Sequence, residues 1–325
     1  MNLLFDGNWH FHKTFSVFAS YYKNQDMKEV LQDPEKRQVL IRKCIIDMCA
    51  AVKRFEDDVK RVAFVIDSSS WRYNFYDNYK YALTKVREDY YKEFLEVLDE
   101  FEALLRKKGI IVSRVKGAEG DDLLYVWSLY FGYVLEEELV IVTGDSDIRQ
   151  IMNKNVSLFN NNSKNLKFYC VPEREIYWNE YLDSDVQVIP TKPFDVLLYK
   201  VILGDKSDNI PQLKRGFGEK AFEKFLKFIE PCQRPGDVDI VDMAQWITGN
   251  FCKFTNDDYH EILGKVLFNL RMVWLNVAVY NNTNYYVESG KSLLERMLDD
   301  VNEQKENYKY KSIYTLENFY GMIIK

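Results

Sequence analysis

Three acidic motifs contain the residues of this sequence whose types and spacing are best suited to catalysis. They read Gly117-Ala118-Glu119-Gly120-Asp121-Asp122, Thr143-Gly144-Asp145-Ser146-Asp147 and Gly204-Asp205-Lys206-Ser207-Asp208-Asn209. Asp6 and Asp67 each follow a short apolar run, which brings the total to nine carboxylates. Like charges at close range raise one another's pKa and repel, so such a cluster requires cations if the side chains converge.

The ligand type indicates which cation these motifs suit. They offer carboxylate oxygens without a histidine or cysteine partner, which favours Mg²⁺ or Mn²⁺ over zinc. Two such ions about 4 Å apart hold the attacking and leaving oxygens of a phosphoryl displacement. The residues therefore predict hydrolysis of a phosphodiester by a metal-activated water, without a covalent enzyme intermediate.

Four apolar runs, each followed by acidic residues, must position these side chains. They cover residues 3–5, 61–66, 110–115 and 139–143, and helical periodicity lies between them over 39–55 and 93–107. Strand and helix in alternation predict an α/β fold, with a parallel sheet and helices on both faces. In such sheets ligands bind at the carboxyl ends of the strands, and the acidic residues come at those ends.

The sequence changes character near residue 190. Helical patterns then dominate, over 194–203, 219–229, 241–247, 259–280 and 292–302. We therefore expect a catalytic domain over residues 1–190 and a helical domain over residues 191–325. Before this boundary, the asparagine-rich tract 160–165 predicts the tip of a hairpin that leads into residues 166–171.

Composition and charge exclude several classes of protein. Of 325 residues 47% are hydrophobic, while 14 are Gly and 7 are Pro, which excludes low-complexity disorder. The longest stretch without a charged residue, 272–287, has 16 residues and is too short for a bilayer span. Asp6 interrupts the N-terminal apolar run and the five cysteines form no C-x-x-C pair, so we expect a reduced, cytoplasmic protein. The nine candidate carboxylates account for nine of the 50 acidic residues, and the other 41 are matched by 44 basic ones, so the net charge of −6 does not exclude nucleic acid.

In their order along the chain, these motifs resemble those of the 5′ nuclease (flap endonuclease) superfamily. That family has an Asp after each of its first two strands, then E-A-D-D, S-G-D-x-D and G-D-x-S-D-N-I-P. The resemblance covers roughly residues 1–230 and is greatest with the phage branch, whose T-even members are named ribonuclease H and act as 5′→3′ exonucleases. It implies a PIN-like parallel sheet flanked by helices, a helix–three-turn–helix module and a C-terminal helical domain.

The resemblance also implies an activity. The chain would be a 5′→3′ exonuclease and structure-specific 5′-flap endonuclease that uses two Mg²⁺ ions, with Mn²⁺ as a substitute. Its substrates would be branched or nicked DNA and RNA–DNA duplexes, from which it would remove RNA primers or flaps during replication. We expect a monomer, in the cytoplasm of the host if a phage encodes it, with no membrane partner.

Carried over residue by residue, the family's metal ligands fall on the nine carboxylates. The first metal site would involve Asp6, Asp67, Glu119, Asp121 and Asp122. The second would involve Asp145, Asp147, Asp205 and Asp208. Position 120 is Gly where the family has Ala, a change that we expect to be harmless.

The segment 71–80 interleaves aromatic and basic residues between Asp67 and Glu119. A cation beside the metal ions can hold the scissile phosphate, and aromatic rings can stack on an unpaired base. In the family an Arg and a Tyr-Lys pair occupy this segment, so Arg72 and Lys80 are the catalytic candidates, with a solvated amphipathic helix as the alternative interpretation. The family's arch, or clamp, would occupy about residues 70–108.

A Gly-x-Gly sequence precedes the predicted helix at 219–229 and allows backbone N–H groups to approach a phosphate. The resemblance implies that this module grips duplex DNA through Lys214, Arg215, Gly216, Gly218 and Lys220. The family often binds K⁺ here, but Gln-Leu-Lys-Arg replaces its G-V-P and is one residue longer, which argues against a K⁺ site. A simple helix-capping turn is the alternative.

The same residues bear on other possible functions and on partners. A haloacid-dehalogenase-type phosphatase needs Asp-x-Asp at position 6, and position 8 is Asn8. A PIN-type ribonuclease shares the acidic sheet but typically lacks the Gly-x-Gly module, and a non-enzymatic scaffold would have lost carboxylates. The apolar tail 313–324 either packs on the helical domain or docks a sliding clamp or another replication protein, such as a single-strand-binding protein.

Overall fold

The computed structural model describes residues 1–55, 58–80, 89–162, 165–229, 240–251, 256–281 and 290–309. The chain divides into two compact units. The sheet unit comprises residues 1–71, 87–191 and 280–325, and the helical unit comprises residues 72–86 and 192–279. The division after residue 191 lies beside the boundary expected near 190. A single boundary does not describe the whole chain, however, because residues 72–86 belong to the helical unit and residues 280–325 belong to the sheet unit.

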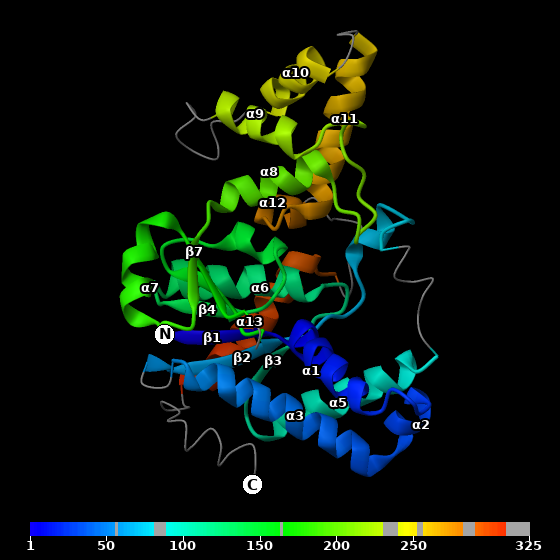
Figure 1. The fold of residues 1–325 in the computed structure, drawn as a ribbon, viewed down its shortest axis with the longest axis vertical. Helices are drawn as coiled ribbons and strands as arrows, with labels where there is room; N and C mark the ends of the chain where they lie inside the picture. The colour runs from blue at the N-terminus through cyan, green and yellow to red at the C-terminus, as the bar shows by residue number, and fades with distance from the viewer. Residues whose placement is uncertain are drawn as a thin grey trace. The chain divides into compact units, whose positions relative to one another are not determined.

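A seven-stranded sheet forms the centre of the sheet unit, in the order β3-β2-β1-β4-β5-β6-β7 (Figure 1). The strands are β1 (Asn2–Asp6), β2 (Arg61–Val65), β3 (Ile111–Ser113), β4 (Leu139–Val142), β5 (Val156–Asn160), β6 (Lys167–Cys170) and β7 (Gln187–Pro190). All neighbouring strands are parallel except β5 and β6, which form the hairpin predicted before residues 166–171. The four strands predicted from apolar runs are confirmed as β1 to β4.

Helices cover both faces of this sheet, as predicted. They are α1 (Gly7–Tyr21), α2 (Met27–Gln32), α3 (Pro34–Lys53), α5 (Tyr91–Lys107), α6 (Gly120–Leu129), α7 (Glu175–Tyr181) and α13 (Leu293–Lys309). On one face α1, α3 and α5 share a core with Phe5 and Phe64, whose rings stack with centroids 4.7 Å apart (Figure 1). The other face is packed by α6, against β1 and β2, and by α13, against β3 and α6.

Short helical turns occur at Tyr130–Val134, Asp147–Ile151 and Pro172–Arg174 in the sheet unit, and at Trp71–Asn74, where the chain passes into the helical unit. Helix α5 shows why the sequence pattern was informative. Phe94, Val97, Leu98, Phe101 and Leu105 recur at three- and four-residue spacing, and all five are buried. Residues 91–107 of the expected arch region therefore form a core helix, and residues 81–88 lie outside the described residues.

The helical unit is built from α8 (Pro193–Leu203), α9 (Glu219–Ile229), α10 (Ile240–Phe251) and α11 (Asn256–Val273), and α12 (Val277–Asn281) spans its division from the sheet unit. The predicted helix at 259–280 is thus two helices, α11 and α12. Gly204 ends α8 with a φ of +71°, and a Cβ there would lie 2.4 Å from the carbonyl oxygen of Ile210, so this turn requires glycine. No helix within the described ranges is long and apolar enough to cross a bilayer.

Candidate functional site

The carboxyl ends of four parallel strands place acidic residues side by side. Strands β3, β2, β1 and β4 are neighbours in this order. Asp6 is the last residue of β1, and Asp67 lies two residues beyond the end of β2. We call the acids at these strand ends the acidic edge: Asp6, Asp67, Glu119, Asp121, Asp122, Asp145 and Asp147. The topology therefore places the predicted ligands of the sheet unit along one edge of the sheet.

Asp6 is a buried carboxylate of the acidic edge whose pKa is strongly shifted. It is buried, and its oxygens accept hydrogen bonds from the Trp9 N–H at 3.0 Å and the Thr143 hydroxyl at 2.8 Å. Burial, together with the charges of Asp67 and Asp145, raises the pKa of Asp6 to about 7 despite those two bonds. The charged groups that shift this pKa are carboxylates from neighbouring strand ends. A carboxylate surrounded by like charges in this way is suited to binding a cation.

Asp67 is held by three other segments of the chain. Its backbone N–H donates to Asn8 Oδ1 at 2.8 Å, and its carbonyl accepts from Arg114 Nε at 3.1 Å. Its carboxylate accepts the Gly120 N–H at 2.5 Å. A Cβ on Gly120 would lie 2.7 Å from this carboxylate oxygen, so glycine permits an approach that the family's alanine would obstruct.

Glu119 and Asp122 begin helix α6 as a capping box. The Glu119 N–H donates to Asp122 Oδ2 at 2.9 Å. The fully buried Asp122 also accepts from Trp71 Nε1 at 3.2 Å and from the Tyr280 hydroxyl at 2.9 Å. Glu119 accepts from the Ser70 hydroxyl at 2.8 Å. Both oxygens of Asp122 thus contact protein donors, whereas Asp121 is only half-buried.

Asp145 and Asp147 lie in the turn after β4. Asp145 accepts the Asp147 N–H at 2.8 Å and donates its own N–H to the Thr143 hydroxyl at 3.0 Å. Because this hydroxyl also donates to Asp6, Thr143 connects the turn to the end of β1. Gly144 makes the turn possible, since a Cβ there would lie 2.4 Å from the Trp9 indole.

Within the described ranges, no three His, Cys, Asp or Glu side chains are grouped so that they could hold a metal ion as placed. The chemistry of the acidic edge nevertheless fits a divalent cation. Its candidate ligands are all carboxylates, and one of them, Asp6, is buried beside two like charges. A bound cation would stabilise the ionised form of these groups.

Asp205 and Asp208 follow α8 in the helical unit. Asp205 forms an ion pair with Lys200 and accepts the Ser207 N–H at 2.8 Å. Burial alone would raise the pKa of Asp205, but Lys200 and Ser207 hold it below its usual range. Asp208 accepts from the Tyr79 hydroxyl at 3.1 Å, and its carbonyl accepts the Lys80 N–H at 3.1 Å.

The two catalytic candidates of the helical unit have different surroundings. Lys80 has a φ of +50° and places its ammonium 5.1 Å from the centre of the Tyr79 ring. Arg72 is buried, and its Nε donates to the carbonyl of Met272 in α11 at 2.8 Å. Lys80 and Asp208 are therefore neighbours, while Arg72 connects the turn Trp71–Asn74 to α11. Their catalytic roles stay predictions.

The Gly-x-Gly sequence forms the turn before α9. Gly216 has a φ of +88°, and the carbonyl of Gly218 accepts the N–H groups of Ala221 and Phe222. A cavity of about 670 Å³ opens at this helix end, and its lining includes Gly216, Gly218, Lys220, Lys224 and Phe251. Lys214 forms an ion pair with Asp258 at 3.9 Å. Glycines and lysine in this setting can bind a phosphate.

Some supporting residues were not found from the sequence. From the sequence, Asn8 only disfavours a phosphatase and Arg114 has no indicated role, yet both hold Asp67. Lys224 was also missed, although its spacing of four residues from Lys220 on α9 was a usable signal. No local pattern indicates the roles of Asn8 and Arg114.

The fold and the acidic edge together define an α/β protein with a carboxylate site at the ends of its parallel strands. The chain belongs to the family described as 5′-3′ exonuclease, N-terminal resolvase-like domain, whose model matches residues 2–177. The predicted 5′ nuclease family is thereby confirmed, and the phage branch within it stays a prediction.

Named relatives agree with this family. The chain is 24% identical over 319 residues to a 5′-3′ exonuclease of Mycoplasmopsis pulmonis. This match covers 98% of this chain and 93% of the relative. It is 27% identical over 175 residues to a thermostable DNA polymerase I of Thermus thermophilus, of which it covers 18%. The fold is similar to a zinc-bound 5′-exonuclease of bacteriophage T5, with a TM-score of 0.62, 15% identity and coverage of 95% of this chain and 100% of that chain.

Proposed function

We propose that this chain is a divalent-metal-dependent 5′ nuclease: a 5′→3′ exonuclease and structure-specific 5′-flap endonuclease that removes RNA primers or flaps in the cytoplasm. The observation that carries the proposal is the acidic edge, where Asp6 lies buried beside the charges of Asp67 and Asp145. Membership of the 5′-3′ exonuclease family supports it. A T5 flap endonuclease with a similar fold, at a TM-score of 0.62, has been solved in a complex with DNA and metal ions, which supports DNA as the substrate.

The proposed ions are Mg²⁺, with Mn²⁺ as a substitute. One ion would be held by Asp6, Asp67, Glu119, Asp121 and Asp122, and the other by Asp145, Asp147, Asp205 and Asp208. When bound, such ions make water a better nucleophile and stabilise the charge that develops on the phosphate. Lys200 would have to share Asp205 with a metal ion, because it forms an ion pair with that carboxylate.

The chain's own residues would bind and orient the nucleic acid. Gly216, Gly218 and Lys220 at the start of α9 would hold the phosphates of a duplex, with help from Lys214 and Arg215. Lys80 would contact the scissile phosphate. Branched or nicked DNA and RNA–DNA duplexes are the proposed substrates. A sliding clamp or single-strand-binding protein would dock on the tail 313–324, which lies outside the described residues.

The direct test is digestion of 5′-labelled flap, nicked and RNA–DNA substrates with Mg²⁺ and with EDTA. We expect short products from the 5′ end with Mg²⁺ only. Asp145→Asn should reduce turnover by roughly 1,000-fold, because it removes a carboxylate of the acidic edge. Asp183→Asn is the matched control, since this aspartate pairs with Arg54 on the surface.

Several outcomes would argue for another function. Release of products from the 3′ end, or full activity of Asp145→Asn, would contradict the proposal. Faster cleavage of single-stranded RNA than of any flap would favour a PIN-type ribonuclease. The phosphatase is disfavoured further because Asn8 holds the Asp67 backbone, and its side chain is thus engaged away from a catalytic role.

A further inference from the structure

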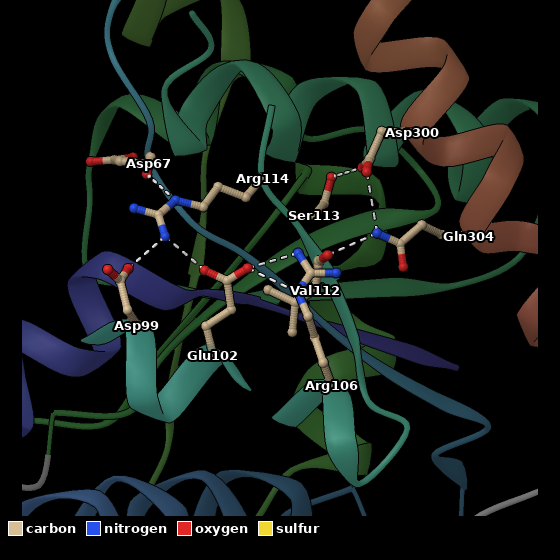
Figure 2. A network of polar contacts seen from close by, with 9 residues as sticks. All are labelled: Asp67, Asp99, Glu102, Arg106, Val112, Ser113, Arg114, Asp300 and Gln304. Atoms are coloured by element: carbon tan, nitrogen blue, oxygen red, sulfur yellow. Dashed lines mark hydrogen bonds and ion pairs between the residues drawn. The ribbon is translucent and has the colours of Figure 1, made fainter. Parts of the chain in front are cut away.

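Arg114 connects the acidic edge to helix α5. It directly follows β3, and its Nε donates to the backbone carbonyl of Asp67 at 3.1 Å. Its Nη1 donates to Asp99 at 2.7 Å and to Glu102 at 2.8 Å, both on α5 (Figure 2). One planar guanidinium thus binds the main chain at the end of one strand and two carboxylates of a core helix.

The α5 end of this connection is rigid for two reasons. Glu102 is largely buried and is shared by two arginines, since Arg106 donates its Nε to Glu102 at 2.9 Å (Figure 2). Charge-assisted hydrogen bonds of this kind are stronger than neutral ones. Helix α5 itself is held in the core by Phe94 and Phe101. The orientation of the Arg114 guanidinium is therefore determined by α5.

Side chains contribute to the position of Asp67 beyond the end of the sheet ladder. Strand β2 ends at Val65, and the main-chain bonds beyond it are made by the neighbours of Asp67: the N–H groups of Ile66 and Ser68 donate to the carbonyls of Ser113 and Ala118. Asn8 binds the N–H of Asp67 and Arg114 binds its carbonyl, while Gly120 binds its carboxylate. Arg114 differs from the other two because its side chain is also bound to carboxylates of α5, a helix whose residues include no predicted ligand.

We propose that Arg114 is a positioning residue, which fixes the Asp67 main chain and so sets the affinity of the acidic edge for a divalent cation. The inference rests on the proposed function, in which Asp67 is a metal ligand. Groups that orient metal ligands typically change metal affinity by about 10- to 100-fold when they are replaced. The contact of Arg114 is to the backbone, so its loss leaves the ligand itself in place.

The test compares Arg114→Lys with Arg106→Lys. Lysine keeps a positive charge for Asp99 and Glu102 but lacks the guanidinium fork that also reaches Asp67. Arg106→Lys makes the same replacement on the same Glu102 without a contact to Asp67. Free Mn²⁺ is measured by electron paramagnetic resonance in a titration without DNA, and the rise in Tm with MgCl₂ is followed in parallel.

We expect Arg114→Lys to weaken Mn²⁺ binding about tenfold, while Arg106→Lys binds like the wild type. On flap DNA, the Mg²⁺ concentration for half-maximal kcat should rise for Arg114→Lys, with KM for DNA unchanged. If Arg114→Lys does not fold, Glu102→Gln removes the anchor and leaves Arg114 in place. We expect it to weaken Mn²⁺ binding by roughly threefold, less than the loss of Arg114 itself.

Unchanged Mn²⁺ affinity in Arg114→Lys, or an equal loss in Arg106→Lys, would overturn the positioning role. If the wild type binds Mn²⁺ but does not cleave flap DNA, the proposed function fails, and the Mn²⁺ titration still decides the role of Arg114. A wild type that binds no divalent ion would overturn both.

Discussion

Asp6 in the sheet unit and Asp205 in the helical unit are both buried aspartates at the end of a regular element, yet their electrostatics are opposite. Burial and the charges of Asp67 and Asp145 raise the pKa of Asp6 to about 7. Burial also acts on Asp205, but Lys200 and Ser207 lower its pKa below the usual range. Each of the two residues exposes less than a tenth of its surface, so the difference lies in the groups that surround them.

The difference teaches which carboxylate depends on an external cation. Lys200 supplies a positive charge to Asp205 from one turn earlier on α8. The groups that act on Asp6 are a backbone N–H, a hydroxyl and two more carboxylates. A metal ion would therefore relieve repulsion at the acidic edge, whereas at Asp205 it would compete with a lysine. Two of four experiments test this contrast directly, and the other two test further residues of the sheet unit.

The largest effect is expected on catalysis by Asp6→Asn. Removing this carboxylate should lower kcat on flap DNA by roughly 1,000-fold or more, because a central anionic oxygen of the acidic edge is lost. The rise in Tm with MgCl₂ should disappear in Asp6→Asn and persist in Asp205→Asn. Equal metal-dependent Tm shifts in the two variants would contradict the contrast.

The second effect concerns His10, another buried titratable group of the sheet unit. Burial and Lys13 lower the pKa of His10 to about 4, and its Nε2 lies 2.9 Å from the carbonyl of Cys44. As the pH falls from about 6.5 to about 4, the unfolded chain binds a proton that the folded protein does not. The free energy of unfolding should therefore decrease by roughly 3 kcal/mol over this range.

Urea unfolding of metal-free protein at several pH values would measure this decrease. In His10→Gln most of it should be absent, and the difference between the two proteins removes the contribution of other groups. An identical pH dependence in both would show that His10 is not responsible.

The third effect concerns stability without metal, where the two aspartates should have opposite signs. At pH 8, Asp6→Asn should raise the free energy of unfolding by on the order of 2 kcal/mol, because it removes a charge whose ionised form is disfavoured in the fold. Asp205→Asn should lower it by about 1–2 kcal/mol, because Lys200 loses its partner. Denaturant titrations in EDTA would measure both, and changes of the same sign would refute the contrast.

The smallest effect is expected at Gly120. A Cβ there would lie 2.7 Å from Asp67 Oδ1, so Gly120→Ala should displace this carboxylate and lower kcat roughly tenfold. Gly264→Ala is the matched control, since a Cβ at that position on α11 meets nothing within 4 Å. Full activity of Gly120→Ala would show that Asp67 tolerates the shift.

Much of this site could be predicted because its signals are local. Apolar runs followed by acids gave strands β1 to β4 and their carboxylates, and the order of the motifs gave the family. Strand β7 was missed because its residues are only partly buried, so no strong apolar run marks it. The chain also divides at 72–86 and 280–325, which depends on contacts between distant residues.

The arrangement around each acid was equally inaccessible from the sequence. Lys200 and Asp205 are five residues apart, but this spacing does not show that their side chains form an ion pair. The contacts of Asp67 with Asn8 and Arg114 span 59 and 47 residues. Such contacts follow from the packed structure, and they determine the electrostatics that the motifs leave open.

The edge strand β3 has a consequence for how the protein is made. Its residues are covered by α13, where Asp300 accepts from the Ser113 hydroxyl and Gln304 donates to the Val112 carbonyl at 2.7 Å (Figure 2). The latter contact joins residues 192 positions apart. A ribosome that adds 5–20 residues per second needs roughly 10–40 s for that distance. Strand β3 therefore leaves the ribosome long before α13 does. Helix α13 can pack on this edge of the sheet only after most of these 325 residues have been translated.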